Sequence, residues 1–190
     1  MSDLEINGNT PQTVRKIAAQ LRRVGWMGFW LQLVLAVVST LIFLFAIPFA
    51  STGASNPGTG GSLLFAVGGL LVLYASTYWS FRYVMTSRKL KNPDLRPKKA
   101  DTVKLVQWGL LCSVSGMGSS VMGAESIAGT LLGKSLSLAQ PFAVYSPDAL
   151  SKIIQPLDIF IVLANTHTIT AHFIGIVSAL WLLSQLNKQG

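Results

Sequence analysis

The side chains best suited to chemistry lie in the last apolar stretch of the chain, Gln155–Leu183. A helix of about 20 residues suffices to cross a bilayer, and this stretch is longer. It nevertheless carries seven polar residues inside or at the edge of the span: Asp158, Asn165, Thr166, His167, Thr168, Thr170 and His172. Asp158, Asn165 and His172 are seven residues apart, so on a helix they drift by only about 20° per step and share one face. Buried polar groups of this kind mark pathways, partners or bundle interiors.

A further carboxylate, Glu125, lies in the preceding apolar stretch. If that stretch runs outward and the last runs inward, Glu125 and Asp158 share the outer side. Asn165 and His172 then lie about 10 and 20 Å deeper, at 1.5 Å per residue. Such a descending series of ligands suits a cation or proton pathway, and Thr168 joins it. The alternatives are carboxylates wetted at the interface, and amide, hydroxyl and imidazole groups that hydrogen-bond between helices.

Three side chains are candidate ligands for a transition metal: His167, His172 and Met122. The two histidines are five residues apart, about 140° around a straight helix, so they are poorly placed to chelate one ion. Packing explains the methionine equally well. No cofactor is predicted, and a metal ion such as iron enters the hypothesis as cargo.

Four apolar runs predict an all-α membrane protein with four transmembrane helices. The runs cover residues 26–49, 62–81, 105–132 and 157–183. In the preceding segment, 1–25, Val14, Ile17 and Leu21 recur at helical spacing beside several cations, which predicts an amphipathic helix on the membrane surface. A solvated extension of the first span is the alternative. Residues 184–190 are the predicted tail.

Lysine and arginine residues predict the orientation. The hydrophilic loop 82–104 carries eight cations, the amino-terminal segment four and the tail one, whereas the opposite connections hold Lys134 and Lys152. Thirteen against two predicts that both termini and the loop are cytoplasmic. Because these cations flank the apolar runs, they indicate contact with the lipid bilayer and not with nucleic acid.

The third span is rich in small residues at a spacing that lets helix backbones approach closely. These predicted packing positions are Gly116, Ser119, Ser120 and Gly123. The segment Leu136–Tyr145 is apolar but too short to span, so an interfacial and a re-entrant segment are both open. A single small bundle without an evident inverted repeat indicates a homo-oligomer or a subunit of a larger complex.

Catalytic motifs are missing from the sequence. It contains no H-E-x-x-H, no G-x-S-x-G, no P-loop and no C-x-x-C. The single cysteine, Cys112, excludes an intramolecular disulfide. We therefore predict that the protein is not an enzyme.

Two stretches, LRRVGWMGFWLQLVL (Leu21–Leu35) and QPLDIFIVLANTHTITAHFIG (Gln155–Gly175), resemble a cyanobacterial and plastid membrane family grouped under a domain of unknown function. Its plant members are described as a chloroplast inner-envelope translocon component and as a chloroplast iron permease. The resemblance covers most of the chain from about Thr10 onward, and no catalytic or binding residues carry over from it.

The short leader contains Asp3 and Glu5, unlike a transit peptide, so we expect a cyanobacterial form in the plasma or thylakoid membrane. The function that follows is a small-cation permease or permease subunit, with iron as candidate cargo. The alternative is a non-catalytic subunit, or an assembly or scaffold factor, of a photosynthetic or protein-translocation complex.

Overall fold

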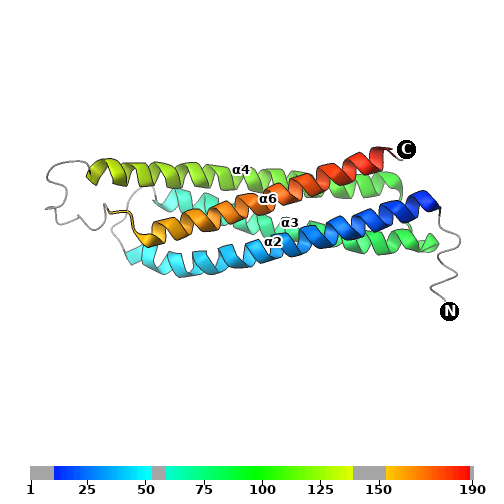
Figure 1. The fold of residues 1–190 in the computed structure, drawn as a ribbon, viewed down its shortest axis with the longest axis horizontal. Helices are drawn as coiled ribbons and strands as arrows, with labels where there is room; N and C mark the ends of the chain where they lie inside the picture. The colour runs from blue at the N-terminus through cyan, green and yellow to red at the C-terminus, as the bar shows by residue number, and fades with distance from the viewer. Residues whose placement is uncertain (1–10, 53–58, 139–152, 189–190) are drawn as a thin grey trace.

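The computed structural model describes residues 11–52, 59–138 and 153–188, and most of them lie in long helices (Figure 1). These helices are α2 (Gln12–Thr52), α3 (Thr59–Lys91), α4 (Lys99–Leu138) and α6 (Pro156–Lys188), and a 3-10 turn, η1 (Pro93–Leu95), joins α3 to α4. The predicted all-α class is confirmed. Most of Leu136–Tyr145 falls outside the described residues, so its interfacial or re-entrant character stays a prediction.

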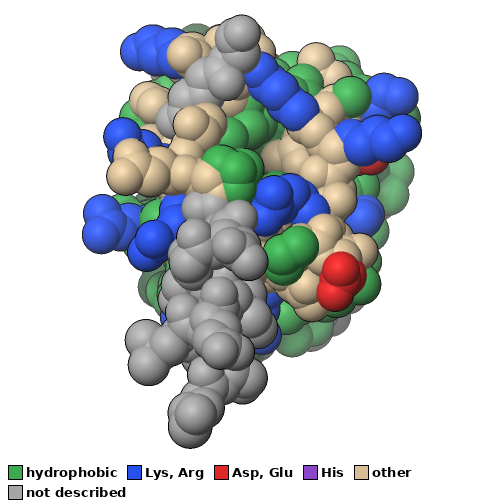
Figure 2. Space-filling model, turned by 90° about the vertical axis from the view of Figure 1, so that its right-hand side faces the viewer, with side chains coloured by type: hydrophobic (Ala, Val, Ile, Leu, Met, Phe, Trp, Pro, Cys, Tyr) green, Lys and Arg blue, Asp and Glu red, His purple; other side chains and the backbone are tan. Residues whose placement is uncertain are grey.

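The four helices form a bundle in which α2 and α4 each pack against both α3 and α6, and α3 also touches α6. The start of α2, the turn between α3 and α4, and the end of α6 lie together at one end (Figure 1). We call this the basic end. Lysine and arginine side chains surround it, and few carboxylates are seen there (Figure 2).

The helices are longer than the predicted spans, and the predicted loop 82–104 is mostly helical. α3 continues to Lys91 and α4 begins at Lys99. The three cations in the last turn of α3 face the negative end of its dipole, which favours the extra turns. Asn92 accepts a hydrogen bond from the Asp94 backbone N–H at 3.1 Å and so begins the short η1 turn. Hydrophilicity alone did not indicate these helical turns, which lysine and arginine favour as good helix formers. The cytoplasmic location of residues 82–104 stays a prediction.

The predicted surface helix is not seen as a separate element, because α2 runs without a break from Gln12 to Thr52. Its first turns pack into the bundle: Ala18 and Leu21 are fully buried. They belong to an apolar cluster with Tyr83 of α3 and Leu186 of α6. This arrangement matches the alternative of an extended first span.

Three helices are long and apolar enough to cross a membrane by length and composition: Gln12–Phe45, Leu64–Lys91 and Pro156–Lys188. The predicted third span, 105–132, is helical within α4 but is not among them. Five glycines and five serines stand among its 28 residues, which lowers its mean hydropathy. Its 20 residues between Lys104 and Glu125 carry no charge.

The core of the bundle consists of two apolar clusters. The cluster near the basic end is built around Leu21, Val106 and Leu182. The cluster near the opposite end is built around Phe43, Leu73 and Ala164. Buried glutamine and serine side chains lie between the two clusters along the helices.

The small residues of α4 lie where other helices come closest. A Cβ added to Gly123 would lie 3.0 Å from the backbone nitrogen of Ala66 in α3. Ser119 donates a hydrogen bond to the Phe65 carbonyl at 3.0 Å, and Ser120 is fully buried. Side chains larger than these would hold α3 and α4 apart.

This close approach predicts the effect of a larger side chain at Gly123. Gly123→Leu forces the α3 backbone away and should lower the free energy of unfolding by about 1–3 kcal/mol, as overpacking does in other cores. Gly129→Leu is the matched control, because a Cβ added to Gly129 has nothing within 4 Å. Thermal unfolding in detergent measures both variants, and an equal loss in the two would contradict this packing.

Candidate functional site

The predicted polar stripe of α6 faces the interior of the bundle. Asn165 is 2% exposed, and Thr168 and His172 are 0% exposed. Gly175 and Ala179 continue the same buried face toward the basic end. The seven-residue spacing therefore placed these side chains on the correct side of the helix.

The His172 side chain extends from α6 to α3 and occupies a space beside Gly116 of α4. Its Nε2 is 3.1 Å from the Gly69 carbonyl oxygen. Because a carbonyl oxygen only accepts, this contact places a proton on Nε2, and in the neutral ring Nδ1 is then an acceptor. Nδ1 is buried without a hydrogen-bond partner among the described residues. Gly116 provides the space, since a Cβ there would overlap the imidazole ring.

Asn165 and Thr168 leave similar acceptors in the interior. The Asn165 amide nitrogen donates to the Ser120 carbonyl at 3.0 Å, whereas its Oδ1 is buried and unpartnered in the described part of the chain. The Thr168 hydroxyl donates to the Ala164 carbonyl of its own helix at 3.0 Å. Its oxygen keeps acceptor capacity. The stripe thus presents oxygen and nitrogen acceptors from Asn165 to His172.

Asp158, predicted at the outer mouth, already has two partners. Its Oδ2 is 2.7 Å from Lys134 Nζ and accepts the Gln155 backbone N–H at 2.9 Å. With Pro156 as the first residue of α6, Asp158 is the acidic residue that reaches back to cap the helix. The structure therefore gives this carboxylate a helix-capping and ion-pairing role.

Glu125 does not join the stripe. It is exposed on the outer surface of α4, away from the bundle interior. Lys134, and not Glu125, meets Asp158, and Glu125 lies nine residues before Lys134, about 14 Å further along the helix. Glu125 was expected on the outer side with Asp158 as part of one path, but its side chain is exposed, because an apolar run alone does not determine the rotation of α4.

The three candidate metal ligands lie in different surroundings. His172 is fully buried, whereas Met122 is 57% exposed on the outer surface of α4. His167 is only partly buried and lies on another side of α6. Within the residues that the structure describes, no three His, Cys, Asp or Glu side chains gather around a common point.

Gln32 is the central polar residue that sequence reasoning missed. Its Nε2 donates to Ser76 Oγ at 3.0 Å and to the Ala171 carbonyl at 3.2 Å, and its Oε1 accepts from Ser80 Oγ at 2.8 Å. Ser76 in turn is 2.7 Å from Ser113 Oγ. The network joins α2, α3, α4 and α6. A single amide within the apolar run 26–49 was the signal that could have identified it.

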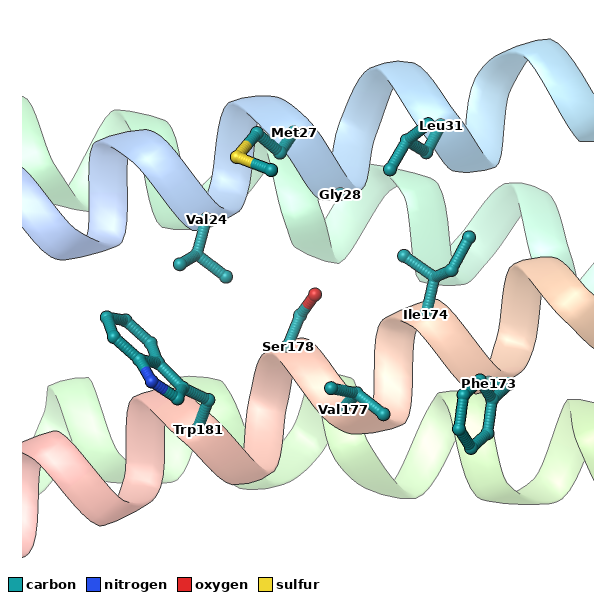
Figure 3. Close-up of a pocket in the computed structure, with 9 residues that line it drawn as sticks. All are labelled: Val24, Met27, Gly28, Leu31, Phe173, Ile174, Val177, Ser178 and Trp181. Atoms are coloured by element: carbon teal, nitrogen blue, oxygen red, sulfur yellow. The ribbon is translucent and has the colours of Figure 1, made fainter.

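A groove of about 290 Å³ lies between α2 and α6 (Figure 3). Its walls are apolar and include Met27, Leu31, Phe173 and Trp181. Ser178 points across it toward α2 and contributes a hydroxyl (Figure 3). The groove is separate from the acceptors of the α6 stripe.

A family model described as "Protein of unknown function (DUF3611)" matches residues 11–187. Among curated proteins, the chain is similar to Protein TIC 21, chloroplastic, from Arabidopsis thaliana, with 33% identity over 175 residues. The aligned region covers 90% of this chain and 57% of that relative, so the chain spans little more than half of its length. No solved structure matches. The family resemblance predicted from the two sequence stretches is confirmed.

The Gln32 network predicts a loss of stability when its amide is removed. Gln32→Leu removes three hydrogen bonds, and at about 0.6 kcal/mol for each intramembrane bond the unfolding free energy should fall by about 2 kcal/mol. Gln107→Leu is the control, because Gln107 is exposed on α4. Unfolding by a denaturing detergent compares the two, and a Gln32 variant as stable as the control would show that the network contributes nothing.

Proposed function

We propose that this chain, which belongs to the DUF3611 family, is a small-cation permease or permease subunit that crosses its membrane four times. It is an integral membrane protein, with three helices of sufficient length and hydropathy to span. The observation that carries the transport proposal is the row of buried hydrogen-bond acceptors on α6 that have no donor in the described part of the chain. Asn165 Oδ1 and His172 Nδ1 lack partners among the described residues, although burial without a partner is costly.

The fourth crossing is proposed for α4. Its 20 uncharged residues between Lys104 and Glu125 extend about 30 Å, the thickness of a hydrocarbon core. Its outward surface carries large apolar side chains, including Trp108, Leu111 and Met122. Polar small residues on its inner surface are hydrogen-bonded within the bundle, as intramembrane polar groups require.

The proposed orientation places the basic end in the cytoplasm. The cations gathered there support this, because cytoplasmic segments near spans carry the excess of lysine and arginine. Both the start of α2 and the end of α6 then lie on the cytoplasmic side. We further propose a cyanobacterial plasma or thylakoid membrane as the location.

Iron is the proposed cargo. Imidazole nitrogen together with amide and hydroxyl oxygen suits divalent first-row metals, and the resemblance to a family with a described iron permease agrees with this chemistry. The ion would meet Asn165, Thr168 and His172 in succession, about 10 Å separating the first from the last. Glu125 and Met122 have no part in this path, and no enzymatic role is proposed.

A scaffold or assembly subunit is the second candidate function. Neither acidic residue of the predicted path can bind a cation inside the bundle. Asp158 is paired with Lys134, and Glu125 is exposed on the outer surface. The interior hydrogen bonds also join all four helices into one unit. A rigid bundle with an apolar outer surface suits docking to other membrane helices, in a homo-oligomer or a larger complex.

Metal uptake by proteoliposomes separates the two functions. Reconstituted protein should take up iron saturably, with manganese and zinc compared, and Asn165→Leu/His172→Ala should reduce uptake about tenfold or more by removing two acceptors. Glu125→Gln is the matched control and should retain full uptake.

Thermal unfolding identifies folded variants before transport is measured. Equal uptake by wild type and a folded double variant would overturn the path. No uptake above empty liposomes by correctly inserted wild type would overturn transport itself. Stoichiometric co-purification of a membrane partner would then support the scaffold.

A further inference from the structure

A hollow of about 410 Å³ lies at the basic end, between the last turns of α3 and the first turns of α4. Three cations line it: Arg82 and Lys89 from α3, and Lys104 from α4. Asp101 contributes the one carboxylate, so the four charged residues of its wall sum to +2. The hollow is independent of the acceptors on α6.

The charge of this hollow is not neutralised within the described chain. Among the described residues the ion pair is Lys134 with Asp158, at the opposite end of the bundle. Asp101 forms no ion pair with any of the three cations of the hollow. Lys89 and Lys104 are exposed, so their ammonium groups are free to turn toward an anion. An uncompensated cluster of this kind attracts a phosphate group.

Two tryptophans form the apolar part of the same hollow. Trp79 and Trp108 both line it, and the Arg82 guanidinium lies 4.8 Å from the centre of the Trp79 ring. This cation–π contact holds the guanidinium at the wall. Tryptophan beside arginine and lysine is typical of the level at which lipid headgroups meet the hydrocarbon core.

A second recess continues the hollow along α4. It measures about 420 Å³ and shares Lys104 and Trp108 with the first, and Leu111 extends it. From Lys104 to Leu111 the helix advances seven residues, about 10 Å, toward the middle of the bundle. A ligand with an anionic head and an apolar tail fits this sequence of surfaces.

We propose that this site binds an anionic membrane lipid, with its headgroup phosphate among Arg82, Lys89 and Lys104 and an acyl chain along Trp108 and Leu111. The phosphate oxygens accept charge-assisted hydrogen bonds from the guanidinium and ammonium groups. The acyl chain of the lipid covers the apolar surface of Trp108 and Leu111, which a free phosphate would leave uncovered. This distinguishes the lipid from inorganic phosphate as the ligand.

Lipid retention by the full-length protein tests the proposal. The protein in neutral detergent is titrated with phosphatidylglycerol, and bound lipid is counted by native mass spectrometry, with phosphatidylcholine for comparison. Wild type should retain phosphatidylglycerol in preference, and Arg82→Gln/Lys89→Gln/Lys104→Gln should weaken its binding about tenfold or more. Lys104→Gln alone, at an exposed side chain, should weaken it in the same direction if the triple variant does not fold.

The matched control removes the same charge from the same end of the bundle. Arg15→Gln/Lys16→Gln/Arg22→Gln alters three exposed residues of α2 outside the hollow and should leave lipid binding within about twofold of wild type. An equal loss in both triple variants would show attraction to the whole basic end and overturn the site. Displacement of the lipid by inorganic phosphate at a concentration equal to that of the lipid would overturn the lipid assignment, because the acyl chain would then add nothing to the affinity.

Discussion

The buried Gln32 amide is the interaction on which the bundle depends. Inside a bilayer no water satisfies backbone or side-chain polar groups, so each must find its partner within the protein. Gln32 meets this requirement by bonding to α3 and α6, and Ser76 extends the network to Ser113 of α4. Apolar contacts alone do little to distinguish helix neighbours from lipid, whereas these directional bonds fix which helices meet and at what depth.

The same constraint explains the positions of two glycines, because a polar side chain on one helix needs space on the neighbouring helix. Gly116 leaves room for the His172 ring, and a Cβ added to Gly175 would lie 2.6 Å from the Gln32 amide nitrogen and 2.5 Å from Ser113 Oγ. Each of these polar contacts is therefore paired with a missing side chain. Glycine and serine also lower the mean hydropathy of α4, which is not among the three helices marked by length and composition as able to span.

The sequence predicted periodic features well and partner choice poorly. A seven-residue spacing was enough to place Asn165 and His172 on the buried face of α6, because helix geometry converts spacing into direction. The Lys134–Asp158 pair escaped prediction, because its members are 24 residues apart and on different helices. Glu125 was misplaced for a related reason: one charge in an apolar run does not say which way it faces. Gln32 needed only the observation that an amide within a span is costly.

The labelling of single cysteines tests most directly whether four helices cross the membrane around this network. In a Cys112→Ser background, Lys98→Cys and Ser135→Cys place exposed thiols near the two ends of α4. A membrane-impermeant maleimide should label Ser135→Cys in intact cells and Lys98→Cys only after permeabilisation. Labelling of both positions from the same side would show that α4 does not cross, and would contradict the four-span bundle.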